Sequence, residues 1–333
     1  MKKFIDTLKG QKFDIPPIWM MRQAGRYLPE YREIRKNASD FVELCLTPKL
    51  ATEITVQPIR RFDFDAAILF SDILMIPHAL GQDVTFVKGE GPKLGELPQK
   101  FDFNLSRLDP VFETVTAVKS ELEDKTALIG FAGSPWTVAC YMINGAGSKD
   151  FATVKAYAYK HPEKFDALME TLIHSTSEYL LAQVKAGADA LQLFDSWAGL
   201  VPESLFERCV IHPTAKIVQN IRAEYSDIPI IGFARGAGLY TERYWRGTKV
   251  DAMGLDETVP MFLAKSLQKM VPIQGNLDNA ALLAGGAALD EAVDRILDNF
   301  SDHPFIFNLG HGVIKETPPE HVAQVVERVR RGR

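Results

Sequence analysis

The chain has 333 residues, of which 46% are hydrophobic and 24% charged, and its formal net charge is −5. These ordinary globular values exclude an intrinsically disordered chain, and the acidic balance argues against a nucleic-acid partner. The three cysteines, Cys45, Cys140 and Cys209, are scattered and form no CxxC pair. This pattern excludes a zinc ribbon and is typical of a reducing compartment, so we expect a cytoplasmic protein.

Neither end of the chain nor any internal run predicts a membrane segment. The N-terminal lysines are not followed by an apolar region, so we expect no signal peptide. The longest uncharged run, from Thr126 to Ser148, contains glycines, a proline and an asparagine. It therefore predicts a buried strand, a loop and a short helix, and we expect no membrane partner.

Short apolar runs of strand length alternate with longer segments of helical periodicity along the whole chain. Eight such runs occur, at residues 18–21, 66–70, 127–131, 190–194, 228–233, 250–255, 271–274 and 305–309. Thr47-Pro48 predicts a helix start, because an N-cap residue precedes a proline at the first helical position. Further helices are expected over residues 162–186, 203–225, 257–270, 290–300 and 318–330.

Continuous apolar strands separated by helices are typical of parallel strands that are covered on both faces. Eight of them favour a closed (β/α)8 TIM barrel over an open doubly wound α/β sheet. No Gly/Ser-rich or Pro-rich linker divides the chain. We therefore expect a single barrel domain over residues 1–333, with room for excursions such as residues 84–105.

Polar, charged and glycine residues follow the apolar runs, among them Arg22, Asp72, Asp195, Arg235 and His311. In a barrel the C-terminal ends of the strands converge on one mouth, so we expect the active site there. Part of this pattern is generic, because turn residues follow strands in any α/β protein. P-loop, Rossmann, nucleophile-elbow and HExxH motifs are absent, so we expect no cofactor and no metal.

The segment Arg22-Gln23-Ala24-Gly25-Arg26 places two guanidinium groups four residues apart, and Arg32 and Arg35 follow. Arginine forks bind carboxylates with two hydrogen bonds, so a cluster of them on an acidic chain predicts a substrate with several carboxylates. The alternative is ion pairing with nearby acids such as Glu30 and Glu33, which we favour for Arg32 but not for Arg22 and Arg26.

The segment from Pro17 to Glu30 resembles the N-terminal signature of the uroporphyrinogen decarboxylase family. The resemblance continues in order along the chain, in Phe70-Ser71-Asp72-Ile73-Leu74, Gly133-Ser134-Pro135-Trp136-Thr137, Phe194-Asp195-Ser196-Trp197, Phe233-Ala234-Arg235-Gly236, Gln274-Gly275-Asn276 and Asn308-Leu309-Gly310-His311-Gly312. Two positions depart from the family pattern. Ser134 stands where a small apolar residue is usual, and Glu257 stands where an aromatic residue is common.

The resemblance implies a cofactor-independent, usually homodimeric (β/α)8 enzyme of haem biosynthesis. Such an enzyme removes the four acetate carboxyl groups of uroporphyrinogen as CO2 and yields coproporphyrinogen. By matching motif positions, the implied substrate-binding residues are Arg22, Gln23, Ala24, Gly25, Arg26, Arg35, Asp72, Tyr141, Ser196 and His311. The implied catalytic residues are Asp72, Arg22, Tyr141 and His311, and no metal is expected.

These residue types suit that chemistry, although each also has an alternative, purely structural interpretation. A tetrapyrrole of this kind carries carboxylates at its rim and N–H donors at its centre, which a carboxylate such as Asp72 can accept. Asp72 could instead be a helix cap, Tyr141 a packed core residue and Ser196 a cap. Two other functions remain open from the sequence. A zinc-dependent methyltransferase would need His and Cys ligands, and a tetrapyrrole carrier would need the arginines without Asp72.

Overall fold

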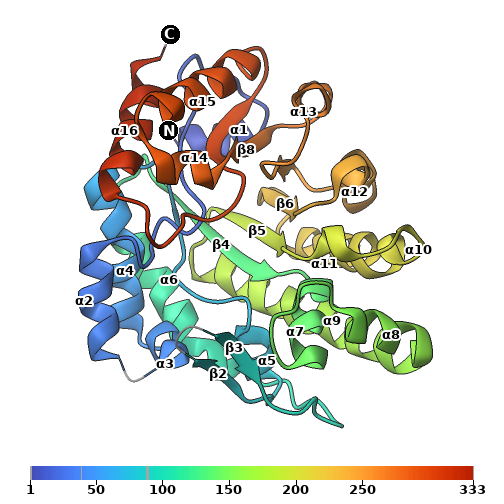
Figure 1. Ribbon diagram of the computed structural model, residues 1–333. Coiled ribbons are helices and arrows are strands. Elements are labelled where there is room, and N and C mark those ends of the chain that lie inside the picture. The colour runs from blue at the N-terminus through green and yellow to red at the C-terminus, as the bar shows by residue number, and fades with distance from the viewer. Residues whose placement is uncertain (1, 39, 88–89, 333) are drawn as a thin grey trace.

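The computed structural model describes residues 2–38, 40–87 and 90–332. Seven parallel strands form one curled sheet in the order β1-β4-β5-β6-β7-β8-β9, and helices cover its outside (Figure 1). The strands are β1 (Ala66–Ile68), β4 (Ala127–Gly133), β5 (Ala190–Asp195), β6 (Ile230–Ala234), β7 (Ala252–Gly254), β8 (Ile273–Leu277) and β9 (Phe305–Leu309). This confirms the predicted α/β fold of TIM-barrel type.

The expected first strand, at residues 18–21, is not a strand. Ile18 forms only an isolated parallel bridge with Phe307 of β9, and its carbonyl accepts a hydrogen bond from Asp65, which precedes β1. The segment thus lies between the first and last strands of the sheet. The segment does not continue as a strand, because side chains accept the hydrogen bonds of the next backbone N–H groups. Met20 N donates to Gln23 Oε1, and Met21 N donates to Asn308 Oδ1.

The excursion expected at residues 84–105 contains a small second sheet. In it β2 (Val84–Val87) pairs antiparallel with β3 (Gly91–Leu94). An isolated bridge joins Lys93 to Ala146, so this hairpin lies against the turn that follows α7 (Pro135–Asn144).

The remaining elements are helical and mostly follow the strands in sequence. The longer helices are α2 (Pro29–Asn37), α4 (Pro48–Phe62), α6 (Asp109–Glu121), α8 (Ala152–Lys160), α9 (Pro162–Ala186), α11 (His212–Glu224), α12 (Thr241–Thr248), α13 (Met261–Gln268), α15 (Gly286–Asn299) and α16 (Pro319–Arg331). The shorter ones are α1 (Lys3–Leu8), α3 (Phe41–Cys45), α5 (Met75–Ala79), α10 (Glu203–Phe206), α14 (Asn279–Ala284) and the single turns Leu105–Leu108, Ala198–Leu200 and Gly238–Tyr240.

The helix expected over residues 203–225 is interrupted by a widened π-helical turn, Glu207–Ile211, between α10 and α11. Pro213 in the first turn of α11 has no N–H to donate to this turn, which favours the irregularity there. The helix expected over 257–270 begins only at Met261. In the described part of the chain, no helix has both the length and the apolar character needed to cross a membrane.

Buried polar side chains link non-adjacent segments of the barrel wall through its interior. Trp19 Nε1 donates to Gln274 Oε1 at 3.1 Å, and Gln274 Nε2 donates to Gln192 Oε1 at 3.0 Å.

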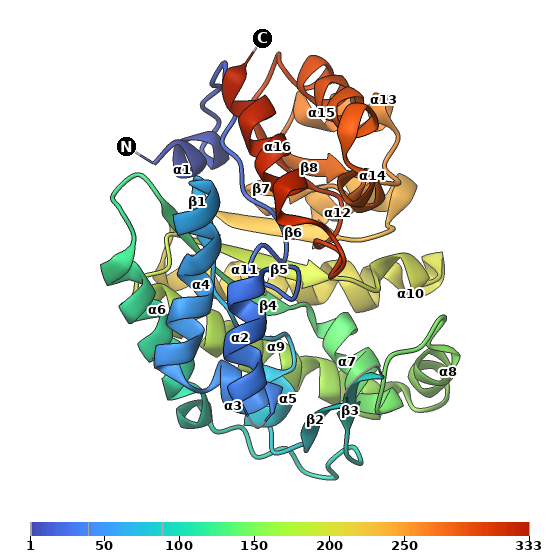
Figure 2. The same ribbon diagram turned by 60° about the vertical axis from the view of Figure 1, so that its left-hand side comes forward.

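Both chain ends lie at the same end of the molecule, beside α1 and α16 (Figure 2). Lys2 pairs there with Asp189 before β5, and Arg330 pairs with Asp65 before β1. The chain ends therefore lie at the N-terminal ends of the strands, away from the expected mouth.

Candidate active site

Arg22 follows the bridging segment in a left-handed backbone conformation, with φ of 61°. The turn that holds it is fixed from within by Gln23, whose side chain is fully buried. Gln23 Oε1 accepts from Met20 N at 3.1 Å, and Gln23 Nε2 donates to Ala66 O of β1 at 3.1 Å. The turn is therefore fastened to the strand that ends beside Asp72.

The loop after β9 lies directly against the Arg22 side chain. Val313 N donates to Met21 O at 3.0 Å, and a Cβ added at Gly312 would lie only 2.6 Å from Arg22 Cγ. Only glycine permits this approach. Arg22 stays accessible to solvent, while the surrounding protein removes enough water to lower its pKa. Both properties together are typical of a side chain that lines a concave mouth.

Asp72 follows β1 and faces the same region. One oxygen, Oδ1, accepts from Leu74 N at 2.8 Å, so the residue does cap the turn that leads into α5. The other oxygen accepts no hydrogen bond from the described residues. Burial raises the pKa of Asp72 to about 6, against the opposing effects of the Leu74 N–H and the Arg22 charge. Asp72 thus caps the turn through Oδ1, as the alternative interpretation expected, while Oδ2 stays free to accept from another partner.

Tyr141 and His311 complete this group around Arg22. Tyr141 lies on α7 and packs against Phe151 and Trp197, with ring centroids 6.1 and 6.2 Å away. Burial raises the pKa of its phenol, which is also sensitive to the charges of Asp72 and Arg22. Burial, together with Arg22 and Arg235, lowers the pKa of His311 to about 3, so its imidazole is neutral at pH 7.

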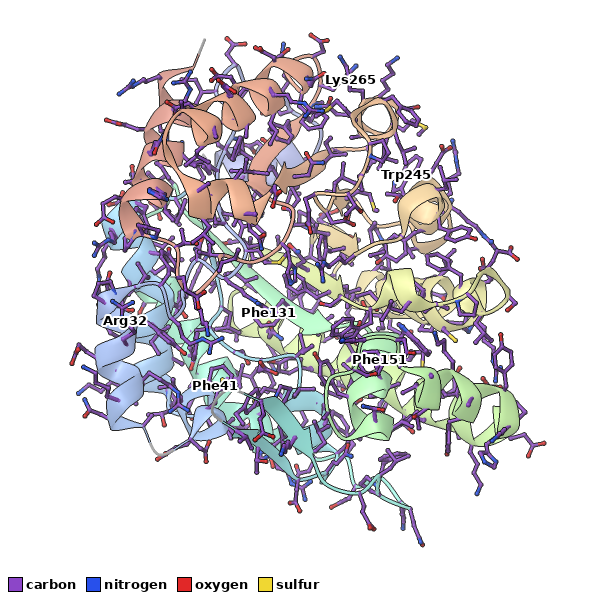
Figure 3. The ribbon with its side chains drawn as sticks, viewed as in Figure 1. Arg32, Phe41, Phe131, Phe151, Trp245 and Lys265 are labelled. Atoms are coloured by element: carbon purple, nitrogen blue, oxygen red, sulfur yellow. The ribbon has the colours of Figure 1, made fainter. Side chains whose placement is uncertain are left out.

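Aromatic side chains form an apolar floor beneath these groups. Phe131, Phe194 and Phe233 come from β4, β5 and β6 and touch in sequence, with centroids 5.6 and 5.9 Å apart. Phe194 lies two residues after Gln192, so strand alternation turns its side chain to the barrel interior. Figure 3 labels Phe131 toward the middle of the molecule, with Phe151 to one side near α7 and α8.

The arginines of the mouth lack the close ion pairs that several arginines on the outer helices have. Arg22 and Arg26 form no ion pair and no side-chain hydrogen bond with any described residue, and Arg235 forms only a loose pair with Glu257 at 3.6 Å. By contrast, Arg60 and Arg328 on the outer helices α4 and α16 are held in close ion pairs. Unpaired guanidinium groups beside an apolar floor are suited to an amphipathic polyanion.

Comparison with known proteins shows the family to which the chain is related. The family model described as uroporphyrinogen decarboxylase (URO-D) matches residues 1–332. A curated uroporphyrinogen decarboxylase of Rhodospirillum rubrum is 50% identical over 99% of this chain and 97% of its own length. One from Chelativorans sp. is 52% identical over 100% of this chain and 99% of its own length.

The chain belongs to the uroporphyrinogen decarboxylase family. Solved structures support the fold alone. A methyltransferase from Methanosarcina mazei aligns with a TM-score of 0.80 at 16% identity, over 99% of this chain and 97% of its own. A B12-independent methionine synthase from Shewanella sp. W3-18-1 aligns with a TM-score of 0.59 at 10% identity, over 96% of each chain.

The residues carried over from the uroporphyrinogen decarboxylase family do not all face the mouth in the same way. Ala24 and Gly25 form the turn between Arg22 and Arg26, and the Gln23 side chain is used within the scaffold. Arg35 lies in the last turn of α2 and donates to Ala38 O at 3.2 Å. Its charge acts on Tyr31 and Cys45, and Cys45 also senses Asp72. Ser196 directly follows β5 and is half-buried.

Three further residues of the mouth were not among the predicted substrate-binding or catalytic residues, although Arg235 was expected at the strand ends. Arg235 follows β6 and lowers the pKa values of Arg22 and His311, and Glu257 pairs with it. Trp197 packs on Tyr141. Arg235 had a sequence signal, since it is a charged residue directly after an apolar run. Within the described ranges, no group of three His, Cys, Asp or Glu side chains is arranged to hold a metal ion.

Proposed function

We propose that this chain is a cofactor-independent carboxy-lyase, a uroporphyrinogen decarboxylase, acting in porphyrin and haem biosynthesis. It removes the four acetate carboxyl groups of uroporphyrinogen III as CO2 and yields coproporphyrinogen III. The observation that carries this proposal is the cluster of Arg22 and Arg26, which have no ion pair among the described residues, and the loosely paired Arg235, gathered with Asp72 above the apolar floor. The near 50% identity to curated decarboxylases over the whole chain supports it.

The charges divide the substrate between rim and centre. The arginines, among them Arg35 of α2, bind carboxylates at the rim, and the Phe131 and Phe194 rings contact the pyrrole faces. The free oxygen of Asp72 accepts from the pyrrole N–H groups at the centre. Gln23, Ala24 and Gly25 shape the turn, and Ser196 contributes a hydroxyl beside the floor.

Each decarboxylation exchanges a carboxyl group for a proton. Protonation of the pyrrole ring creates a cationic electron sink, the bond to the acetate carboxyl breaks, and CO2 leaves with a methylene in its place. A second proton converts the methylene to a methyl group, and the ring proton is lost. Asp72 stabilises the cation where it develops, which is electrostatic stabilisation of the transition state.

The proton donors are drawn from Arg22, Tyr141 and His311. Burial lowers the pKa of Arg22 and so makes its guanidinium a better acid than an ordinary arginine. His311 is neutral at pH 7 and can hand over a proton only from a ring N–H. Burial raises the pKa of Tyr141, so its phenol is protonated in the resting enzyme and has a proton to donate.

We further propose that the chain acts as a single barrel domain, in the cytoplasm, and as a homodimer. The homodimer is what the resemblance to the uroporphyrinogen decarboxylase family implies. Sedimentation velocity tests the dimer. A mass of one chain at micromolar concentration would contradict it.

The proposed activity is tested by anaerobic incubation of the purified protein with uroporphyrinogen III. After oxidation, the porphyrin products are separated by their number of carboxyl groups. We expect conversion from eight carboxyls to four, with matching CO2 release and no loss after exhaustive chelation. Binding without CO2 release would instead indicate a tetrapyrrole carrier, and activity restored by an added metal would contradict the metal-free proposal.

A further inference from the structure

Arg235 and Glu257 are held together by a carboxylate that lies between their two turns. Arg235 directly follows β6, Glu257 follows β7, and these strands are neighbours in the sheet. Asp256 is only 2% exposed, and its Oδ2 accepts from Gly236 N at 2.7 Å. Its Oδ1 accepts from Thr258 N at 2.8 Å. One buried side chain therefore fixes the turn after Arg235 to the turn that carries Glu257.

The ion pair held in this way is incomplete. Arg235 Nη2 and Glu257 Oε1 are 3.6 Å apart, beyond hydrogen-bond distance, and the two side chains are 34% and 23% exposed. No described residue accepts a hydrogen bond from the Arg235 guanidinium. Glu257 Oε2 is buried without a partner and lies against Gly310, where an added Cβ would come within 2.8 Å of it. Both charges thus keep unused hydrogen-bonding capacity.

The position of Arg235 makes it part of the mouth. Its charge reaches Arg22 and His311. Arg22 and Arg26 come from the turn beside β9 and β1, whereas Arg235 comes from β6, so the cations surround the floor from different sides. A rim cation whose only partner is a loosely placed carboxylate is ready to exchange that partner for a better one.

We propose that Arg235 binds one carboxylate of the substrate and that Glu257 is the resident counter-ion which this carboxylate displaces. The proposal rests on the proposed function and adds a specificity-determining pair to it. Glu257 weakens binding of any ligand carboxylate that does not reach Arg235 with good geometry. When an intermediate has lost that carboxylate, Arg235 pairs with Glu257 again. This favours release of the intermediate or its rotation in the mouth.

Steady-state decarboxylation of uroporphyrinogen III by three variants tests the pair. Arg235→Gln should raise KM about tenfold or more, since a hydrogen-bonded charge pair with substrate is lost. Arg235→Lys should recover part of that loss by keeping the charge. Glu257→Gln should lower KM by roughly threefold to tenfold, because it removes the competing counter-ion while keeping the shape. The slope of log KM against log salt should flatten in Arg235→Gln and steepen in Glu257→Gln.

The control variants are Arg60→Gln and Glu53→Gln, which break an exposed pair of 2.8 Å on the outer helix α4 and should leave KM unchanged. An unchanged KM in Arg235→Gln would overturn the proposal. A raised KM in Glu257→Gln would also overturn it, because Glu257 would then merely hold Arg235 in place. Wild-type CO2 release is measured in the same assay. If the wild type releases none, the proposed function fails, whereas normal wild-type turnover with indifferent variants rejects only the pair.

Discussion

Function and backbone strain coincide at Arg22. A non-glycine residue with φ of 61° costs about 1 kcal/mol relative to glycine in the same conformation. The surrounding hydrogen bonds of Gln23 over-determine this turn and keep the guanidinium in the mouth. Asp63, Phe151 and Lys249 share this left-handed conformation, and at Arg22 it is consistent with a residue retained for its side chain.

Two substitutions at Arg22 separate strain from function. Both Arg22→Ala and Arg22→Gly should abolish most activity. Arg22→Gly should have a free energy of unfolding about 1 kcal/mol higher than Arg22→Ala, because glycine adopts the left-handed conformation without strain. Urea unfolding curves of the two variants measure this difference. Equal stabilities would show that the turn is not strained in solution.

We expect the ionised carboxylate of Asp72, which activity requires, to lower the stability of the fold. Burial raises its folded pKa to about 6, above the ordinary value of 3.8. The unfolded chain therefore releases this proton more readily, and the ionised form destabilises the fold as the pH rises from about 4 through 6.

Asp72→Asn removes that charge while its amide oxygen can still accept from Leu74 N. The variant should unfold with a free energy about 1–3 kcal/mol higher than wild type at pH 7.5, and the two should become equal near pH 4. Chemical denaturation at several pH values measures this. A variant less stable than wild type at pH 7.5 would mean that the carboxylate holds the loop together.

At the scale of elements, an Asp-Ala pair begins three strands of the barrel. Asp65, Asp189 and Asp251 precede β1, β5 and β7. Each accepts through Oδ2 from a backbone N–H of the neighbouring segment: Ile18, Leu128 and Ile230, at 2.7, 2.8 and 2.8 Å. Each also pairs with a cation: Arg330, Lys2 with Lys119, and Arg222. The repeated pair thus fixes strand register at the end of the barrel opposite the mouth.

Asp189→Asn should therefore destabilise the protein without altering the chemistry. Burial alone would raise the pKa of Asp189, but the bonds from Lys119, Lys2 and Leu128 N lower it. A lowered pKa stabilises the fold above the unfolded value, and this is lost as the pH falls through the folded value. We expect a loss of about 1–3 kcal/mol at pH 7 and an unchanged kcat. A lower kcat in folded protein would contradict the separation of the two barrel ends.

Hydrophobic periodicity was sufficient to predict seven of the eight apolar runs as strands of one parallel sheet. It failed at residues 18–21. There the backbone N–H groups donate to side chains, one from the nearby Gln23 and one from the distant Asn308, and not to the backbone of a neighbouring strand. It also missed the π-helical turn Glu207–Ile211, because the apolar pattern continues through it. Patterns of burial are visible in a sequence, whereas individual side-chain acceptors are not.

The whole molecule is acidic, yet its mouth is cationic, and this contrast predicts a salt dependence. Arg26 is exposed and unpaired among the described residues, so ions screen its attraction for a carboxylate. KM for uroporphyrinogen should rise with salt. Arg26→Ala should raise KM with little change in kcat, because a carboxylate clamp acts equally in ground and transition states. The same variant should show a flatter salt dependence, and a normal KM would contradict the rim assignment.

The candidate site could be predicted from sequence to the extent that strand ends meet at one mouth. Arg22, Asp72 and His311 follow apolar segments, and the charge of Arg22 does act on the pKa values of both Asp72 and His311. The scaffold use of Gln23 and the pairing of Arg235 with Glu257 depend on contacts between segments far apart in the chain. Such contacts need the three-dimensional arrangement of the barrel.

The central claim is that the Asp72 carboxylate stabilises the cation formed during decarboxylation. Single-turnover decarboxylation of uroporphyrinogen III by Asp72→Asn, with the fold verified by circular dichroism, tests it most directly. We expect the chemical step to slow at least tenfold and up to about 10²–10³-fold, as for the loss of one electrostatic stabiliser. A rate near that of the wild type would contradict the claim and reduce Asp72 to the cap of the turn before α5.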